Sequence, residues 1–411
     1  KGCKGDCPVN VDLATYKAEF LSHYYQGRLR PRHAYAMGWI YWWARIASHM
    51  PRLVNFVTQT RGLRDLAKWL GGIAPQREVP QFAQQTFTDW FRRRPPHNAD
   101  KPPVLLWPDT FNNHFFPEVL KSAVTVLEAA GFRIEVPKIS LCCGRPLYDF
   151  GMLDQARRQL RQILDALQPQ IQEGVPLVGM EPSCVAVFKD ELVNLFPRDQ
   201  DATRLKNQAF GLAEFLDKRA PEFQPPHIER HALVHGHCHH KALVKMEADK
   251  KLLEKMGLDY EVIDSGCCGL AGSFGFEAGH YDVAQSIGDL VLLPAVRQAG
   301  KETMIVADGF SCREQIAHST DRRAFHTAQV IDAALQHTEL AGEYPERSLE
   351  TSAALPRVPA AAVAVVVAAA ALAGAGWWWR AHAGIDSAAR AASVPHSATK
   401  NDDVNRQPHG T

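Results

Sequence analysis

The triplet Cys-Cys-Gly occurs twice in this chain of 411 residues, at 142–144 and at 267–269. Neighbouring residues of an extended strand point to opposite faces, so both thiols of a doublet can reach one site only where the backbone turns. A glycine after the doublet permits that turn. Each triplet also occupies the same place in a longer pattern of apolar runs and helical stretches, which predicts a duplicated module.

The same order of elements can be followed through both copies. Apolar runs lie at 104–107 and 175–178 in the first copy, and at 232–234, 260–263 and 304–306 in the second. Between these runs, helical stretches end at Gly131 and Gly257. Short β-rich runs that alternate with helices predict an α/β fold with parallel sheets, in which functional loops follow the carboxyl ends of the strands. We expect all seven cysteines of the two copies in such loops.

Clustered thiols favour a metal site over small buried hydrophobic residues, because thiolates select iron–sulfur clusters or zinc. The second copy supplies four cysteines, Cys238, Cys267, Cys268 and Cys312, which is enough for a complete site. The first copy supplies three, Cys142, Cys143 and Cys184. The place of Cys238 is taken there by Asp109 or Thr110, so the first site is incomplete, borrowed or lost.

Four histidines lie within three positions of Cys238 in the sequence, namely His235, His237, His239 and His240. They could bind metal, donate hydrogen bonds to sulfur, or lie solvated on a loop. We favour hydrogen bonding that tunes a metal site.

The chain begins in the middle of a second cysteine pattern. Cys3 and Cys7, followed by Pro8, match the latter half of the ferredoxin run C-x2-C-x2-C-x3-C-P. The first two cysteines of that run would precede Lys1, which indicates a fragment of a longer protein. Cys3 and Cys7 could serve different 4Fe-4S clusters in that protein, and we expect them to bind nothing in this chain by itself.

Residues 11–100 are helical in pattern, rich in aromatic residues and interspersed with arginines. Such mixtures can mark nucleic-acid or membrane surfaces. The net charge of the chain is only +1, so we expect no nucleic-acid partner. We interpret these helices as packed on the Cys-Cys-Gly domains, with docking to a flavin domain or a membrane as the alternative.

Composition changes after about Tyr344, where an alanine-rich tail begins. Its uncharged run at 358–379 ends on three tryptophans and could cross a bilayer, lie on the surface as a helix, or be disordered. Nine cysteines gathered in loops favour a reducing compartment and metal ligation over disulfides. We therefore expect a cytoplasmic protein, with association at the inner face of a membrane as an open alternative.

These residues resemble the cysteine-rich Cys-Cys-Gly domain of iron–sulfur oxidoreductases over about residues 1–340. The segments 1–12, 109–113 and 181–184 resemble the carboxyl-terminal half of fusions between an FAD-linked oxidase and an iron–sulfur part, of the D-2-hydroxyglutarate or D-lactate dehydrogenase type. The family often ends each copy with Cys-x-x-Cys, whereas Glu181 and Gly309 stand at the first of those positions here.

The resemblance implies an iron–sulfur electron-transfer module with a 4Fe-4S cluster. It would pass electrons from FAD on an upstream domain of the parent chain to a quinone-like acceptor, while a D-2-hydroxy acid is oxidised at the flavin. Two alternatives are a thiol/disulfide enzyme like heterodisulfide reductase and a structural zinc module. The glycines of 266–275 do not form a strand-borne Gly-x-Gly-x-x-Gly motif, so this chain alone is not expected to oxidise substrate.

The predicted divisions of the chain follow from these patterns. They are 1–30, the end of a ferredoxin-like segment; 31–101, a helical connector; 102–220 and 221–340, the two Cys-Cys-Gly domains; and 341–411, the tail.

Overall fold

Two parallel sheets organise the part of the chain that the structure describes. The structure is a computed structural model that describes residues 7–9, 11–337, 340 and 342–349. The first sheet has the order β2-β1-β3-β4, with β1 Pro103–Trp107, β2 Arg133–Glu135, β3 Leu177–Gly179 and β4 Ala209–Phe210. The second has the order β6-β5-β7, with β5 His231–Val234, β6 Asp259–Val262 and β7 Met304–Val306. The predicted α/β class with two copies is confirmed.

The first strand of each copy lies between its two neighbours. β1 pairs with β2 at Val104 and Ile134 and with β3 at Leu106 and Val178, and β5 lies between β6 and β7 in the same manner. Three polypeptide segments therefore leave the same edge of each sheet, one from each carboxyl end of three adjacent strands. β4 is a two-residue strand that the sequence pattern did not predict.

The central strand of each sheet is buried on both faces, as is usual in parallel sheets. In β1, Val104 and Leu106 join one apolar cluster, whereas Leu105 and Trp107 join a second on the opposite face. β5 divides in the same way between the first cluster and a third. The first cluster thus receives side chains from both sheets.

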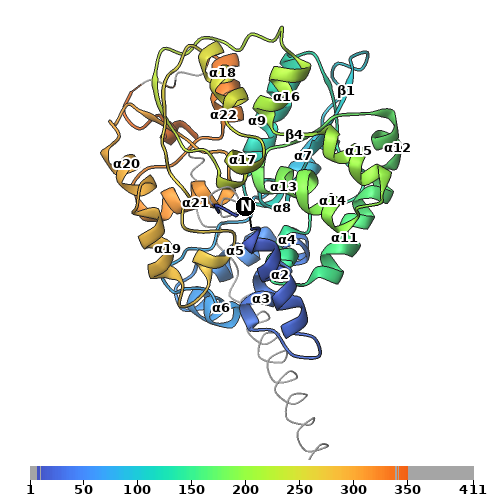
Figure 1. Cartoon of the computed structure of the whole chain (residues 1–411). Helices are drawn as coiled ribbons and strands as arrows, with labels where there is room; N and C mark the ends of the chain where they lie inside the picture. Colours follow the sequence, from blue (N-terminus) through green and yellow to red (C-terminus); the bar gives the residue numbers. More distant parts are fainter. Residues whose placement is uncertain (1–6, 10, 338–339, 341, 350–411) are drawn as a thin grey trace, which may run out of the picture. The chain divides into compact units, whose positions relative to one another are not determined.

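Four helices fill the layer shared by the two sheets. They are α9 Pro117–Ala129, α16 Leu212–Arg219, α18 Glu247–Lys255 and α22 Thr327–Leu335. α9 packs on α22, where Ser122 donates to Asp332 at 2.7 Å, and α16 packs on α18. Figure 1 shows these helices together, with the first copy in green and the second in yellow to orange. The two copies therefore share one core.

The remaining helices lie on the outer faces and between the strands. Those of the first copy are α8 Thr110–His114, α10 Arg145–Asp149, α11 Leu153–Ala166, α12 Gln168–Glu173, α13 Pro182–Ala186, the π-helix η1 Val187–Glu191, α14 Leu192–Leu195 and α15 Gln200–Gln208. Those of the second are α17 Cys238–Leu243, η2 Phe274–Phe276, α19 Tyr281–Gly288, α20 Leu292–Gln298 and α21 Phe310–Ser319, with η3 Pro345–Leu349 after them.

In the described part of the chain, the helices that precede the first sheet are drawn in blue in Figure 1: α2 Leu13–Tyr24, α3 Arg32–Gly38, α4 Ile40–Ala47, α5 Pro51–Gln59, α6 Leu63–Gly71 and α7 Phe87–Arg93. They pack on both copies. Arg30 donates to the carbonyls of Phe150 and Gly151 at 2.7 and 2.9 Å, and Arg77 donates to the carbonyl of Gly275 at 2.8 Å. This packing agrees with the interpretation that we favoured for the segment, although the domain boundaries remain a prediction.

His114 ties the amino-terminal helices to the first copy and should make stability depend on pH. Its ring is buried between Ser48 and Asn113, at 2.7 and 3.2 Å, and burial lowers its pKa to about 4. A depressed histidine pKa favours the folded state above the unfolded pKa near 6.5, and this contribution is lost as pH falls through the folded pKa. We expect a loss of about 3 kcal/mol between pH 7 and pH 4 from this group.

Urea denaturation of the wild-type chain and of His114→Gln at both pH values checks this expectation. The glutamine keeps a polar group but cannot protonate, so its free energy of unfolding should fall less on acidification. An equal fall in both proteins would contradict the assignment.

No helix in the part of the chain that the structure describes is long and apolar enough to cross a membrane. The predicted span at 358–379 lies outside the described residues, as does Cys3.

Candidate metal centre

The cysteines of each copy are placed by the three segments that leave the carboxyl edge of its sheet. In the second copy, Cys238 follows β5, the doublet Cys267-Cys268 follows β6, and Cys312 follows β7. The glycine after the doublet, Gly269, has a φ of +100°, and its counterpart Gly144 has a φ of +77°. These left-handed residues make the turn that the doublets need.

The structure corrects one expectation about these segments. Cys184 and Cys312 lie in helices, as the third residues of α13 and α21, and Cys238 is the first residue of α17. Each helix begins almost directly after its strand, with Glu181, Gly309 and His237 as the respective N-cap residues. Of the seven cysteines of the two copies, only those of the doublets lie outside helices and strands.

The four thiols of the second copy are neighbours, and each one shifts the pKa of the next. The hydrogen bond between Cys238 and Cys267 raises the pKa of Cys238 and lowers that of Cys267. Cys268 bonds to both Cys267 and Cys312, and these bonds raise its own pKa. The bond from Cys268 in turn holds the pKa of Cys312 well below its usual range. The fold thus brings all four predicted ligands together, although Cys238 and Cys312 are 74 positions apart in the sequence.

Two features of the second copy favour negative charge on sulfur. His235 and His237 lower the pKa of Cys312 further, which supports the tuning role that we favoured for the histidines. Cys312 also lies in the first turn of α21, where the helix dipole stabilises a thiolate. His240 has a different partner, since its Nε2 lies 2.7 Å from Asp249.

The three cysteines of the first copy also meet. Cys143 and Cys184 have their sulfur atoms 3.1 Å apart, and a hydrogen bond to Cys143 is the largest cause that raises the pKa of Cys142. A bond from Cys143 lowers the pKa of Cys184, but burial and the carboxylates of Asp109 and Glu181 raise it to about 11. Buried thiols of this kind keep their protons until a metal replaces them.

One cavity of about 1030 Å³ reaches both sets of cysteines. Six cysteines line it, namely Cys142, Cys143, Cys184, Cys238, Cys267 and Cys268. The amino-terminal helices contribute apolar walls, including Met37 and Ile40, and the two copies contribute Phe111 and Phe310, whose rings stack at 4.1 Å. A largely apolar space with a few polar groups is the usual form of a small-molecule site.

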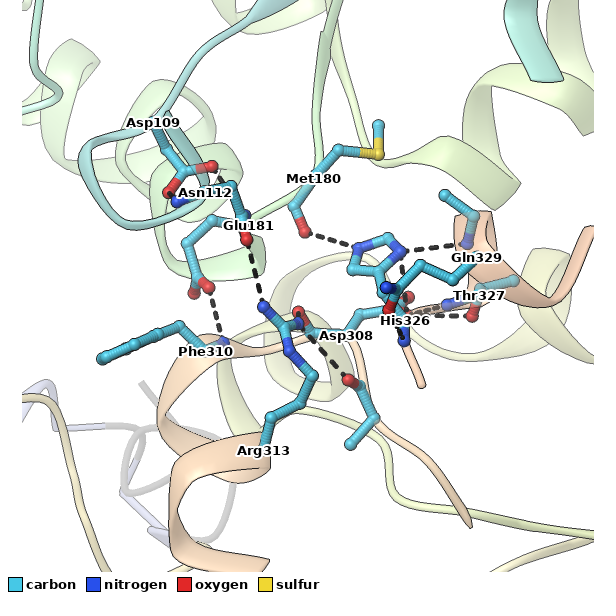
Figure 2. A network of polar contacts seen from close by, with 12 residues as sticks. Asp109, Asn112, Met180, Glu181, Asp308, Phe310, Arg313, His326, Thr327 and Gln329 are labelled. Carbon is cyan, nitrogen blue, oxygen red and sulfur yellow. Dashed lines mark hydrogen bonds and ion pairs between the residues drawn. The ribbon is translucent and has the colours of Figure 1, made fainter. Parts of the chain in front are cut away.

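A buried polar network joins the two copies beside the cysteines, and Figure 2 shows it. Glu181 caps α13 by accepting from the amide of Ser183 at 3.1 Å, and its other oxygen accepts from the amide of Phe310 at 2.7 Å. Arg313 donates to Asn112 at 3.0 Å, again across the copies. Glu181 thus holds the starts of two helices, one from each copy, together.

Sequence reasoning missed Arg313, Asp308 and His326. Asp308 accepts from the amide of Thr327 at 2.8 Å, and His326 contacts the carbonyl of Met180 at 2.9 Å. Most of these partners are more than 100 residues distant in the chain, so no local signal marks them.

Cys7 is half-buried and does not line the cavity. No disulfide joins the cysteines that the structure describes. Within the same residues, no three His, Cys, Asp or Glu side chains are already arranged as a site for a single metal ion.

Comparison with known proteins agrees with the duplication. The sequence model of the Cysteine-rich domain family, CCG, matches residues 109–189 and 233–317. One component of the anaerobic glycerol-3-phosphate dehydrogenase of Escherichia coli is 27% identical over 289 residues, which are 69% of this chain and 72% of that protein. The lactate utilization protein A 1 of Bacillus mycoides is 26% identical over 233 residues, or 53% of this chain and 91% of that protein.

A longer relative matches over only part of its length. The D-2-hydroxyglutarate dehydrogenase of Pseudomonas putida is 24% identical over 343 residues. The match covers 80% of this chain but 33% of that enzyme. Components of oxidoreductases therefore recur among the similar proteins.

Proposed function

We propose that this chain is the iron–sulfur electron-transfer part of a flavin-linked dehydrogenase, because the sequence model of the cysteine-rich domain matches it twice. The observation that carries the proposal is the meeting of Cys238, Cys267, Cys268 and Cys312 at the carboxyl edge of one sheet. Four thiolates are the usual ligands of a 4Fe-4S cluster, which accepts and releases one electron at a time.

The surrounding residues suit such a group. Cys268 and Cys312 are 4% and 1% exposed, so two ligands are shielded from water. His235, His237 and the start of α21 favour the thiolate form of Cys312, and these groups would also set the reduction potential. Cys238 and Cys267 face the cavity, which gives electrons a short exit toward a bound acceptor.

The finer parts of the proposal rest on similarity. A flavin-binding domain or subunit would supply electrons from FAD, and a D-2-hydroxy acid such as D-2-hydroxyglutarate or D-lactate would be the substrate. The two relatives that are named as dehydrogenases or parts of one support an oxidoreductase role of this kind. The apolar cavity supports a quinone-like acceptor, because it is large enough for a flat apolar ring system.

The test is the iron, zinc and acid-labile sulfide content of the anaerobically purified chain, with visible spectra before and after dithionite. We expect about four irons and four sulfides for each cluster and a visible band that bleaches on reduction. Cys267→Ala should lose one cluster completely. Zinc without sulfide would instead support the structural zinc alternative, and unchanged metal content in Cys267→Ala would contradict the role of this residue in either site.

A further inference from the structure

The contacts of the two copies match residue by residue, except at one position. Cys312 is the third residue of its helix and bonds to Cys268, the second cysteine of its doublet. Cys184 is likewise the third residue of its helix and lies 3.1 Å from Cys143, again the second of the doublet. The remaining contact of the second copy joins Cys238 to Cys267, the first cysteine of the doublet.

Thr110 occupies the place of Cys238 in the first copy. It is the first residue of α8 after the central strand β1, as Cys238 is the first residue of α17 after the central strand β5. Its hydroxyl oxygen lies 3.6 Å from the sulfur of Cys142, the first cysteine of that doublet. A hydroxyl therefore stands where the second copy has a thiol.

Asp109, the other residue that could correspond to Cys238, caps the helix α8 instead. One of its carboxylate oxygens accepts from the amides of Phe111 and Asn112, both at 3.0 Å, and the other accepts from the Asn112 side chain at 2.8 Å. It is the N-cap of α8, as His237 is the N-cap of α17. Since both of its carboxylate oxygens are bonded at the helix start, Asp109 corresponds to His237 and not to Cys238.

The four positions of the first copy are closed to bulk solvent but open to the cavity. Thr110, Cys142 and Cys184 are each 6% exposed and Cys143 is 3% exposed, and all four line the cavity. Arg145, one residue after Gly144, lines the same space and places a cationic group near Cys143. A neutral hydroxyl is a poorer ligand for iron than a thiolate, so an anion that enters the cavity could compete for this position.

We propose that the first domain binds its own iron–sulfur cluster through Cys142, Cys143 and Cys184, and that Thr110 leaves one iron open to an exchangeable anionic ligand from the cavity. The proposal rests on the iron–sulfur function proposed above and adds a second, unequal site. The complete site in the second copy would carry electrons only, whereas the first could also bind a small molecule.

Iron and sulfide content tests the cluster of the first domain separately from the cluster of the second domain, on which the proposed function rests. In chains with wild-type circular dichroism, Cys142→Ser and Cys267→Ser should each retain about half of the wild-type iron and sulfide, and Cys184→Ser should repeat the first result. Full retention in Cys142→Ser and Cys184→Ser, with half lost in Cys267→Ser, would overturn the second site but leave the proposed function intact. Full retention in Cys267→Ser would contradict the proposed function itself.

Cyanide, a small anionic ligand for iron, tests whether the iron beside Thr110 has an open coordination position. Added to dithionite-reduced protein, it should change the electron paramagnetic resonance spectrum saturably in the wild type and in Thr110→Ser. Thr110→Cys differs from Thr110→Ser by one atom and should keep its iron but lose the response, because a fourth thiolate closes the site. A wild type that does not respond, or a Thr110→Cys that responds equally, would overturn the open position.

Discussion

Replacing Gly269 by alanine should destabilise the folded chain by roughly 3–5 kcal/mol, one of the largest effects expected of any single methyl group. At a φ of +100° an L side chain is strained, and its Cβ would lie 2.1 Å from the carbonyl oxygen of Ala284. Ala284 belongs to α19, so the added atom must push a packed helix away from the doublet. Urea denaturation should show a much lower midpoint for this variant.

The matched control is Gly144→Ala in the other copy. This glycine has a φ of +77°, but the nearest atom to an added Cβ is the side-chain oxygen of Gln159, at 3.3 Å. That side chain can move, so the cost should be only that of the left-handed backbone, about 1 kcal/mol. Equal losses in the two variants would show that backbone conformation alone, and not the approach of α19, requires glycine at both positions.

The second large effect is expected at Arg145, which follows the first doublet. Its guanidinium forms ion pairs with Glu191, which is 1% exposed, and with Asp149 at 3.1 Å. Arg145→Met keeps much of the side-chain volume but leaves the carboxylate of Glu191 buried without this cation. Breaking a buried pair from one side costs about 3–5 kcal/mol, and we expect a loss of that size in the free energy of unfolding.

A double-mutant cycle checks the cause of that loss. Arg145→Met combined with Glu191→Gln should recover part of the stability, because the uncompensated buried charge is removed together with its partner. Additive losses from the two single changes would indicate that Arg145 acts through packing or through Asp149. The same variants can be assayed for iron content, since Arg145 lies on the cavity beside Cys143.

Features that depend on local physics were predicted correctly from the sequence. Runs such as 104–107 and 232–234 became the central strands β1 and β5, because an apolar β-rich run is buried on both faces in a parallel sheet. The left-handed glycines after both doublets also follow from the triplet itself. The prediction that every cysteine lies in a loop was wrong for Cys184, Cys312 and Cys238, because their helices begin almost directly after the strands.

What the sequence by itself determined is the repeat, its α/β class and the set of thiols that each copy can offer. Only the tertiary structure decided that Thr110, and not Asp109, corresponds to Cys238. The sequence places these two residues side by side, but just one of them contacts Cys142 while the other caps a helix. Only the tertiary structure joined Glu181 to Phe310 and Arg313 to Asn112, and gathered six cysteines around one cavity. Such contacts link residues far apart in the chain, so they arise from the packing of whole elements and leave no periodic signal in the sequence.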